Sequence, residues 1–320
     1  MHGYVAAKGS NPVTVPKPDF YDNKNKRNID QLEIMDAVPT KKFKHNNCHS
    51  DDQGPSGFIW DETDYSCAYD SLFTILLSIW NRDPIVWKTH FCNINRTLNL
   101  LASGFHKHST GEISLEMARD KVRRILQQRD PVLFPTGTAG VNIHDLIDHM
   151  FMMSQPLTSL YIRCLTCNHI LNLNNERVTG LFQCPNEFVG STADFFRHSI
   201  AHGISRKCEK CDGMMEKVTH FHKSPTILLC ALNNAELTLS RRLTLNVGHR
   251  QKTYYLRGII YFGNFHFTSR IVMGNGNVWF HDGIATGGRT QRHGRLAYLS
   301  DLDLMICDGK KAAILVYSVK

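Results

Sequence analysis

Residues 66–80 have the sequence Ser-Cys-Ala-Tyr-Asp-Ser-Leu-Phe-Thr-Ile-Leu-Leu-Ser-Ile-Trp, and this stretch decides the fold. Apolar side chains recur on one side of it at helical spacing, namely Tyr69, Leu72, Phe73, Leu76 and Trp80. Further apolar residues fill the opposite side, so we expect a helix over 67–80 that other elements surround. Ser66 is the predicted N-cap residue, which places Cys67 in the first helical turn.

The pattern along the chain changes from helical to extended. Two further helices are predicted over 115–129 and 141–152, so residues 58–155 should be mainly helical. After Pro156, apolar runs bounded by turn residues predict strands over 159–163, 170–173, 178–183, 226–232, 253–262, 266–273, 278–281 and 312–319. Helices followed by antiparallel strands indicate an α+β fold.

The composition of this 320-residue chain suits a folded domain with a polar tail. We expect residues 1–57 to be disordered and the ordered part to begin near Phe58. Although 42% of the residues are hydrophobic, no apolar run is long enough to span a bilayer, and the first residues resemble no secretory signal. We therefore expect no membrane partner. Cysteines in closely spaced pairs then favour reduced thiols, and hence the cytoplasm or nucleus.

The formal net charge is +8, and residues 241–252 and 289–295 are rich in arginine and lysine. Such stretches can attract nucleic acid through its phosphates. They are more often an ordinary solvated surface, and no base-reading motif accompanies them. The charge therefore does not favour nucleic acid as a partner.

A thiol, an imidazole and a carboxylate occur in the order Cys67, His266 and Asp282. These are the groups of a cysteine nucleophile, its base and the residue that orients the base. The first turn of a helix favours a thiolate at Cys67, but the Asp70 carboxylate in that turn would oppose it unless it is paired. Taken alone, Cys67 is more readily explained as a buried inert cysteine, and His266 as an ordinary strand residue.

The predicted turn at 274–277 brings the last two of these groups near each other. Pairing about this turn places Asp282 opposite Ser269, three positions from His266. His281 competes as the base, but side chains alternate along a strand, so it should point to the opposite face from Asp282.

Two Cys-x-x-Cys pairs lie between the thiol and the imidazole. Cys164 and Cys167 form the first pair, and Cys208 and Cys211 form the second, which Gly213 follows closely. This spacing predicts a four-thiolate zinc site, and four thiolates leave no open position, so the zinc would be structural. The alternatives are four unconnected cysteines or a redox pair. Nearby residues could also substitute as ligands, namely Cys184, His169, His198 and His202.

Four motifs resemble those of the ubiquitin-specific proteases, a papain-like family of cysteine deubiquitinases. Residues 67–71, Cys-Ala-Tyr-Asp-Ser, are similar to the family's Cys-Tyr-x-Asn-Ser, with aspartate in place of asparagine. Residues 264–269 and 279–283 resemble the family's Gly-His-Tyr and Trp-Tyr-x-Phe-Asp-Asp segments. Residues 224–229 are similar to its Pro-x-x-Leu strand, and residues 312–317 to its final Ala-Tyr-x-Leu-Val-Tyr strand.

The resemblance covers residues 58–320 and implies three parts: a helical thumb (58–157), zinc-ribbon fingers (158–224) and an antiparallel β palm (225–320). It implies a cysteine-type deubiquitinase that hydrolyses the isopeptide bond after the C-terminal glycine of ubiquitin or a ubiquitin-like modifier. Cys67 would be the nucleophile, His266 the base and Asp282 the residue that orients it.

One position departs from the family pattern near the expected oxyanion hole. The family has an asparagine five residues before the nucleophile, and here that position is Glu62. A carboxylate repels an oxyanion, so Thr63, Ser66 or a backbone N–H would have to take over. The alternative function is a catalytically weak or inactive homologue that binds ubiquitin or nucleic acid.

Overall fold

The structure, a computed structural model, describes residues 54–232, 237–247 and 250–320. The disorder expected for 1–57 therefore falls almost entirely outside the described residues. Residues 54–57 are described, and they lie beside segment 288–290: the Gly57 N–H donates to the Gly288 carbonyl at 3.0 Å. Among the described residues, no helix has the length and apolarity needed to span a membrane.

The first part of the fold is a group of five helices: α1 (Cys67–Trp80), α2 (Pro84–Ile94), α3 (Arg96–Ser109), α4 (Leu115–Arg129) and α5 (Ile143–Phe151). Every residue of α1 is buried, as the apolar residues on both of its sides predict. The predicted bounds of α1 and α4 are confirmed, and α5 is slightly shorter than expected. No helix was predicted over α2 or α3, although the side chains of Asp83 and Asn95 cap their first turns.

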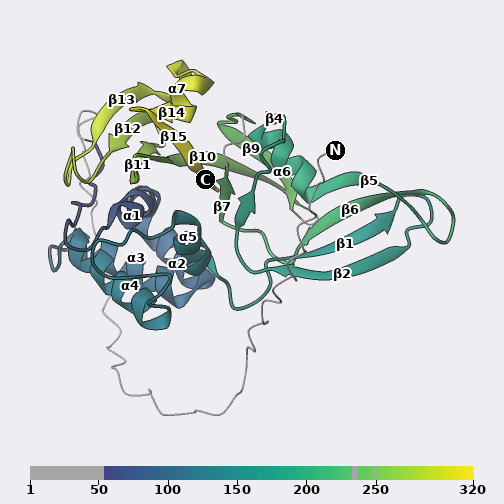
Figure 1. Cartoon of the computed structure of the whole chain (residues 1–320), viewed down its shortest axis with the longest axis horizontal. Coiled ribbons are helices and arrows are strands. Elements are labelled where there is room, and N and C mark those ends of the chain that lie inside the picture. The colour runs from purple at the N-terminus through teal and green to yellow at the C-terminus, as the bar shows by residue number, and fades with distance from the viewer. Residues whose placement is uncertain (1–53, 233–236, 248–249) are drawn as a thin grey trace, which may run out of the picture. The chain divides into compact units, whose positions relative to one another are not determined.

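A nine-stranded sheet covers one side of these helices (Figure 1). Its main order is β13-β12-β11-β10-β15-β7-β3, with β9 paired to β10 and β14 paired to β15. The strands are β3 (Leu181–Gln183), β7 (Ile227–Ala231), β9 (Arg242–Val247), β10 (Arg250–Gly263), β11 (His266–Val272), β12 (Asn277–His281), β13 (Gln291–Arg295), β14 (Ile306–Cys307) and β15 (Lys310–Ser318). All pairs are antiparallel except β3 with β7.

The sheet is buried on both faces, which explains the continuous apolar sequence of its central strands. Along β15, Ile314 and Val316 join the core shared with α1. Leu315 and Tyr317 alternate with them and belong to a second core on the far face. That far face packs against α6 (Thr192–Ile200) and α7 (Asp301–Met305), and η1 (Leu296–Tyr298) leads into α7.

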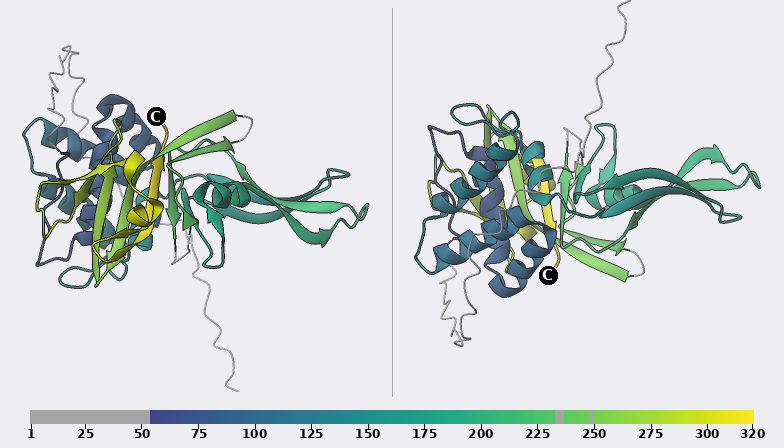
Figure 2. Two further views of the ribbon diagram at one scale, coloured as in Figure 1. Left: turned by 90° about the horizontal axis from the view of Figure 1, so that it is seen from above. Right: turned by 90° about the horizontal axis from the view of Figure 1, so that it is seen from below.

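A separate four-stranded antiparallel sheet extends away from the rest (Figure 2). Its order is β2-β1-β6-β5, made of β1 (Thr158–Cys164), β2 (Ile170–Arg177), β5 (Ala201–Lys207) and β6 (Met214–Phe221). Its buried core is small and contains Ile162, Cys164, Cys208 and Met215. The short strands β4 (Gly190–Ser191) and β8 (Leu237–Thr238) form a parallel pair beside α6.

The predicted register of the β11–β12 hairpin is wrong by one residue. Ser269 pairs with His281, not with Asp282. The reason is the turn, which holds three residues rather than four, because the Met273 N–H donates to the Asn277 carbonyl at 2.9 Å. Gly276 occupies the left-handed position that closes this turn, with φ of 83°.

Candidate functional site

Cys67 is the first residue of α1, and it lines a cleft of about 580 Å³. The thiol-bearing residue is 9% exposed, so its side chain is accessible from one side only. The cleft is lined by residues before Cys67, by the segment that leads into α5 and by the β10–β11 hairpin: Tyr65, Thr138, Gly140, Val141, Asn142, Ile143, His144, Phe262, Phe265 and Phe267, with Ala313 of β15. Three segments distant in sequence therefore meet at this thiol.

The structure brings His266 together with both Asp282 and Cys67. The imidazole Nε2 lies 2.8 Å from Oδ1 of Asp282. Burial alone would lower the pKa of His266, but the ring donates to the Asp282 carboxylate, and this contact and the nearby Cys67 outweigh burial and raise the pKa to about 9. Since Nε2 is occupied by the carboxylate, Nδ1 is the ring nitrogen left for the thiol. The structure thus pairs the imidazole with an orienting carboxylate and places the thiol near the ring.

Asp282 is held as a carboxylate by its surroundings. It follows the last residue of β12, where the chain turns and aims backbone N–H groups at its side chain. Burial opposes the charge, but the contact with His266 and hydrogen bonds from the N–H groups of Ile284 and Ala285 lower the pKa of Asp282 to about 2. The carboxylate is therefore ionised across the physiological pH range and fixes the orientation of the imidazole.

His281, the competing base, does not reach the cleft. It is fully buried, its Nε2 lies 3.0 Å from the Phe58 carbonyl and its Nδ1 lies 3.4 Å from the Thr74 hydroxyl. Burial lowers its pKa, which keeps the ring neutral. His281 and Asp282 thus contact different partners, His281 the Phe58 carbonyl and Asp282 the His266 ring.

Asp70, which sequence alone placed as an obstacle to a thiolate, is paired. Its carboxylate lies 2.9 Å from the guanidinium of Arg119, a side chain of α4 that is itself buried. The Ser66 hydroxyl donates to the other oxygen at 2.6 Å. Burial raises the pKa of Asp70 to about 7, against the opposing pull of Arg119 and Ser66. Arg119 also donates to the Ile59 carbonyl at 2.7 Å, so it fixes the segment that precedes Cys67.

Ser66 stands at the N-cap position of α1, but its side chain makes no cap bond. Its single hydroxyl proton goes to Asp70, and its oxygen accepts from the Asp61 N–H at 2.8 Å. The expectation that the Ser66 side chain caps the helix is therefore wrong, because its backbone is helical (φ −104°, ψ −2°) rather than extended and its oxygen accepts from the Asp61 N–H instead. The first-turn N–H groups of α1 remain without a side-chain cap.

Glu62 and Thr63 lie in an exposed turn before Ser66. Glu62 lines a different surface hollow, beside Ile59 and Glu116, and is not among the residues that line the Cys67 cleft. The Thr63 hydroxyl donates to Asp61 at 2.8 Å. The sequence offered three replacements for the missing oxyanion donor. The hydroxyls of Thr63 and Ser66 donate to Asp61 and Asp70 instead, so the backbone N–H groups at the start of α1 are the remaining candidates.

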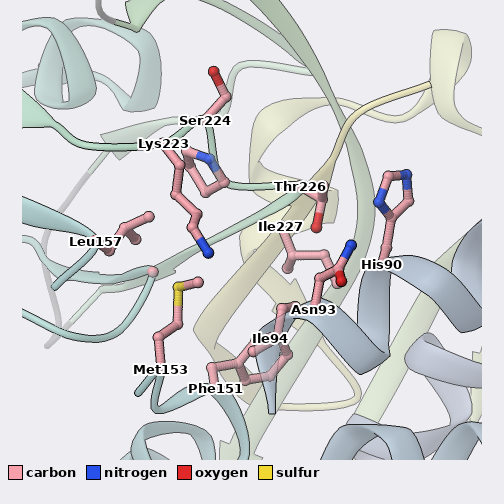
Figure 3. Close-up of a pocket in the computed structure, with 12 residues that line it drawn as sticks. His90, Asn93, Ile94, Phe151, Met153, Leu157, Lys223, Ser224, Thr226 and Ile227 are labelled. Atoms are coloured by element: carbon pink, nitrogen blue, oxygen red, sulfur yellow. The ribbon is translucent and has the colours of Figure 1, made fainter. Parts of the chain in front are cut away.

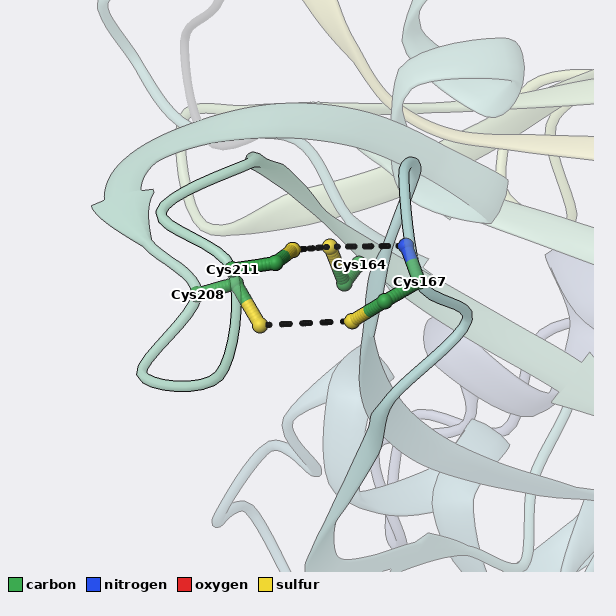
Figure 4. Close-up of side chains that lie close together, drawn as sticks. All are labelled: Cys164, Cys167, Cys208 and Cys211. Carbon is green, nitrogen blue, oxygen red and sulfur yellow. Dashed lines mark hydrogen bonds between the residues drawn. The ribbon is translucent and has the colours of Figure 1, made fainter.

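The four predicted metal ligands form one cluster at the far end of the four-stranded sheet (Figure 4). All four sulfur atoms of Cys164, Cys167, Cys208 and Cys211 lie within 4.8 Å of one another. Cys164 and Cys211 Sγ are 3.5 Å apart, and Cys167 and Cys208 Sγ are 3.7 Å apart. Thiolates bound to one tetrahedral ion at ~2.3 Å would be separated by roughly 3.8 Å. The cluster therefore has the donor set and the spacing to hold one metal ion.

The backbone around the cluster supports the same interpretation. The N–H groups of Thr166 and Lys210 donate to Cys164 and Cys208 sulfur atoms, each at 3.4 Å. Gly213 is required by space, because a Cβ there would lie 2.5 Å from the Thr166 hydroxyl and 3.1 Å from Cys164 Sγ. Within the described residues, the other candidate ligands named from sequence are not part of the cluster.

A second cavity, of about 330 Å³, lies where α2, the end of α5 and the chain before β7 meet (Figure 3). His90 and Asn93 line it from α2, and the Lys223 ammonium group points into it from the opposite side. It shares no lining residue with the Cys67 cleft. Its lining also contains none of the three groups Cys67, His266 and Asp282.

The contact between His266 and Asp282 predicts a measurable change in imidazole basicity. In Asp282→Asn, the pKa of His266 should fall from about 9 toward 6.5, because the neutral amide no longer stabilises the imidazolium. A histidine NMR titration measures this, with His90 as a ring in the same spectrum that should not move. Because the folded-state pKa of His266 is raised, the pair stabilises the wild type fully below pH 6.5, and this contribution is lost as pH rises through about 9. An unchanged pKa in the variant would contradict the contact.

The buried pair of Arg119 and Asp70 predicts a pH-dependent loss of stability. Arg119→Met should lower the free energy of unfolding by about 3–5 kcal/mol at pH 8, because it leaves an unpaired buried carboxylate. The loss should be smaller at pH 5, where Asp70, with its raised pKa, is protonated in the folded state. Urea denaturation at both pH values measures this. Arg124→Met, an exposed position of the same helix, should change stability by no more than about 0.5 kcal/mol. An Arg119→Met, Asp70→Asn double variant should recover most of the loss, and simple additivity would refute the pairing.

Comparison with known proteins finds a match in structure but not in sequence. No family model and no curated protein matches the chain. Two matching solved structures are SAGA deubiquitinase modules of Ubp8, Sgf11, Sus1 and Sgf73, one with a Ubp8 variant bound to monoubiquitin and one bound to ubiquitin aldehyde. Each match has a TM-score of 0.50 at 12% identity and covers 83% of this chain and 69% of the other. At this identity the match concerns the fold alone, and it supports an α+β fold like that of the ubiquitin-specific proteases.

Proposed function

We propose that the chain is a cysteine-type deubiquitinase with the papain-like arrangement of the ubiquitin-specific proteases. Residues 58–157 would be the thumb, 158–224 the fingers and 225–320 the palm. The observation that carries the proposal is the position of the His266 imidazole, whose Nε2 lies 2.8 Å from Asp282 and whose pKa the nearby Cys67 helps to raise. An imidazole paired with a carboxylate beside a thiol that lines a cleft suits nucleophilic catalysis.

In this proposal, His266 holds the proton of the Cys67 thiol as an imidazolium, in keeping with its raised pKa, and the thiolate attacks the carbonyl carbon of the modifier's C-terminal glycine. The carbonyl oxygen becomes an oxyanion, which the uncapped backbone N–H groups at the start of α1 stabilise. The carbon–nitrogen bond then breaks, and the imidazolium returns its proton to the departing lysine amine. A thioester remains on Cys67. Water, deprotonated by His266, cleaves it and restores the thiol, while Asp282 holds the ring in position throughout.

Two observations support ubiquitin or a ubiquitin-like modifier as the substrate. The motifs around residues 67, 266 and 282 resemble those of the ubiquitin-specific proteases. The structural neighbours are deubiquitinase modules bound to monoubiquitin or to ubiquitin aldehyde. The scissile bond would be the isopeptide bond between the modifier's C-terminal glycine and a lysine side chain.

The four-cysteine cluster would hold a structural zinc ion. Four thiolates match the preference of zinc for sulfur and fill its coordination shell, so the metal would take no part in the reaction. Cys164, Cys167, Cys208 and Cys211 come from the two turns at the end of the sheet, and one ion would tie these turns together.

Ubiquitin vinyl sulfone tests the proposed activity. The wild type should form a covalent one-to-one adduct, and Cys67→Ala should form none because the attacking sulfur is lost. His266→Ala should slow labelling by about 10²-fold or more, since the base is removed. Cys92→Ala, which changes an exposed cysteine on α2, is the matched control and should label like the wild type. Gel shift and mass spectrometry measure the adduct.

A ubiquitin-binding protein without activity is the second candidate, and Glu62 favours it. Glu62 takes the sequence position of the family's oxyanion-hole asparagine, and the hydroxyls of Thr63 and Ser66 are both hydrogen-bonded to other carboxylates. Loss of one such donor typically costs on the order of 3 kcal/mol of transition-state stabilisation. Wild type that binds ubiquitin but is not labelled would establish this candidate, and wild type that does neither would exclude both.

The metal proposal predicts about one zinc ion per chain in protein purified without chelator. Cys164→Ser should lose most of this zinc, because three thiolates and a hydroxyl bind it far less tightly. Cys92→Ser should keep it. Elemental analysis by mass spectrometry gives the stoichiometry, and zinc-free wild type protein that is fully folded at its β1–β2 and β5–β6 turns would contradict the assignment.

A further inference from the structure

The residue next to the orienting carboxylate is a buried histidine that the proposed reaction does not use. His281 ends β12 and directly precedes Asp282, and its side chain has no exposed surface. A fully buried imidazole costs free energy unless both of its ring nitrogens have hydrogen-bond partners. The partners of the two nitrogens therefore indicate what the residue does.

Two hydrogen bonds fix the His281 ring and its tautomer. Nε2 lies 3.0 Å from the Phe58 carbonyl, and a carbonyl oxygen can only accept, so Nε2 carries the proton. Nδ1 is then the acceptor, and the Thr74 hydroxyl, 3.4 Å away, is its donor. Burial lowers the pKa of His281, which keeps the ring in this neutral form.

The two partners belong to different segments around the site. Thr74 lies on α1 seven residues after Cys67, which is two helical turns further along the same face. Phe58 lies in segment 54–60, which precedes the helices. One buried ring thus joins the helix that carries the thiol to the end of the strand beside the carboxylate.

Segment 54–60 in turn lies along the chain that follows Asp282. Two backbone hydrogen bonds join these segments, from Trp60 to Gly283 at 3.2 Å and from Gly57 to Gly288 at 3.0 Å. The segment also lies directly on the His281 ring, because a Cβ on Gly57 would be 2.2 Å from the ring carbon Cδ2. The position of the chain around Asp282 therefore depends on how His281 and segment 54–60 fit together.

We propose that His281 is a positioning residue, which sets the place of the Asp282 carboxylate relative to α1 through its bonds to Thr74 and to the Phe58 carbonyl. The inference rests on the proposed function, since Asp282 orients the His266 ring there. His281 is not among the described residues that line the Cys67 cleft, so it acts through Asp282 and not on the substrate.

Two substitutions separate the hydrogen bonds of His281 from its volume. His281→Phe keeps a ring but removes both bonds, so Asp282 should move from its place. The pKa of His266 should then fall from about 9 toward 6.5 in a histidine NMR titration. Labelling by ubiquitin vinyl sulfone should slow about tenfold, because the catalytic groups are misplaced. His281→Gln, whose amide can still donate to the Phe58 carbonyl, should stay close to the wild type in both measurements.

Val278→Ala is the matched control for a loss of stability. Val278 lies in the same strand and is fully buried in the core on the far face of the sheet. The variant should have a lower melting temperature through lost apolar contact. Its His266 pKa and its labelling rate, measured where the protein is folded, should match those of the wild type. A merely structural role of His281 would give His281→Phe the same pattern as this control.

A second pair of variants tests the contact without changing His281. In Gly57→Ala the added methyl group would meet the imidazole, so this variant should reproduce the fall in the His266 pKa. Gly288→Ala is its matched control in the adjoining segment. A Cβ there would lie 3.4 Å from its nearest neighbour, the Ile59 side chain, which is an ordinary contact, so the wild-type pKa should be kept.

The results for the inference and for the proposed function can be told apart. A His281→Phe variant that keeps the His266 pKa near 9 and labels at the wild-type rate would overturn the inference and leave the proposed function intact. Wild-type protein that ubiquitin vinyl sulfone does not label would refute the proposed activity. The titration of His266 needs no substrate, so it would still decide whether His281 holds Asp282 in place.

Discussion

The close packing of α1 against β10 and β11 is the constraint on which the rest of the site depends. A Cβ on Gly258 of β10 would lie 2.5 Å from the Ile75 side chain, so helix and sheet approach each other as nearly as backbone allows. Only at this separation can the first residue of the helix reach the first residue of β11. Cys67 and His266 are almost 200 positions apart in sequence, and no local element connects them. The packing of the fully buried α1 against β11 holds them near each other.

The features that could be predicted from sequence are those that a single short segment determines. The α1 and α4 helices have strong apolar periodicity, and the two Cys-x-x-Cys pairs have a spacing that requires little context. The β11–β12 register was missed by one residue, because the residues at 274–277 suit either a three- or a four-residue turn. The length of the turn depends on which pair of residues forms the hydrogen bond that closes it, here Met273 and Asn277. Residue types alone do not determine that pair.

The features that escaped prediction are those that depend on distant partners. The Asp70 carboxylate would oppose a thiolate at Cys67 if it were unpaired. Its partner, the Arg119 guanidinium, comes from a different helix. Ser66 has the residue type of a helix cap, yet the carboxylate four positions later captures its hydroxyl. The left-handed backbone of Phe265, with φ of 55°, was likewise not predicted, because it follows from a two-residue connection between β10 and β11 whose pairing had to be known first. In each case the local preference is real and a tertiary contact overrides it.

The small core of the four-stranded sheet has a further consequence. With only Ile162, Cys164, Cys208 and Met215 buried together, this part gains little from the hydrophobic effect, and half of that core consists of potential metal ligands. With the proposed ion, its folding equilibrium would be governed by mass action, because an ion that binds only the ordered form stabilises it in proportion to the logarithm of its free concentration. The four-stranded sheet and the rest of the molecule would therefore unfold as two separate units of different stability. Depletion of the ion would release the tip of the sheet as a separate unit, while the helices and the nine-stranded sheet stay assembled.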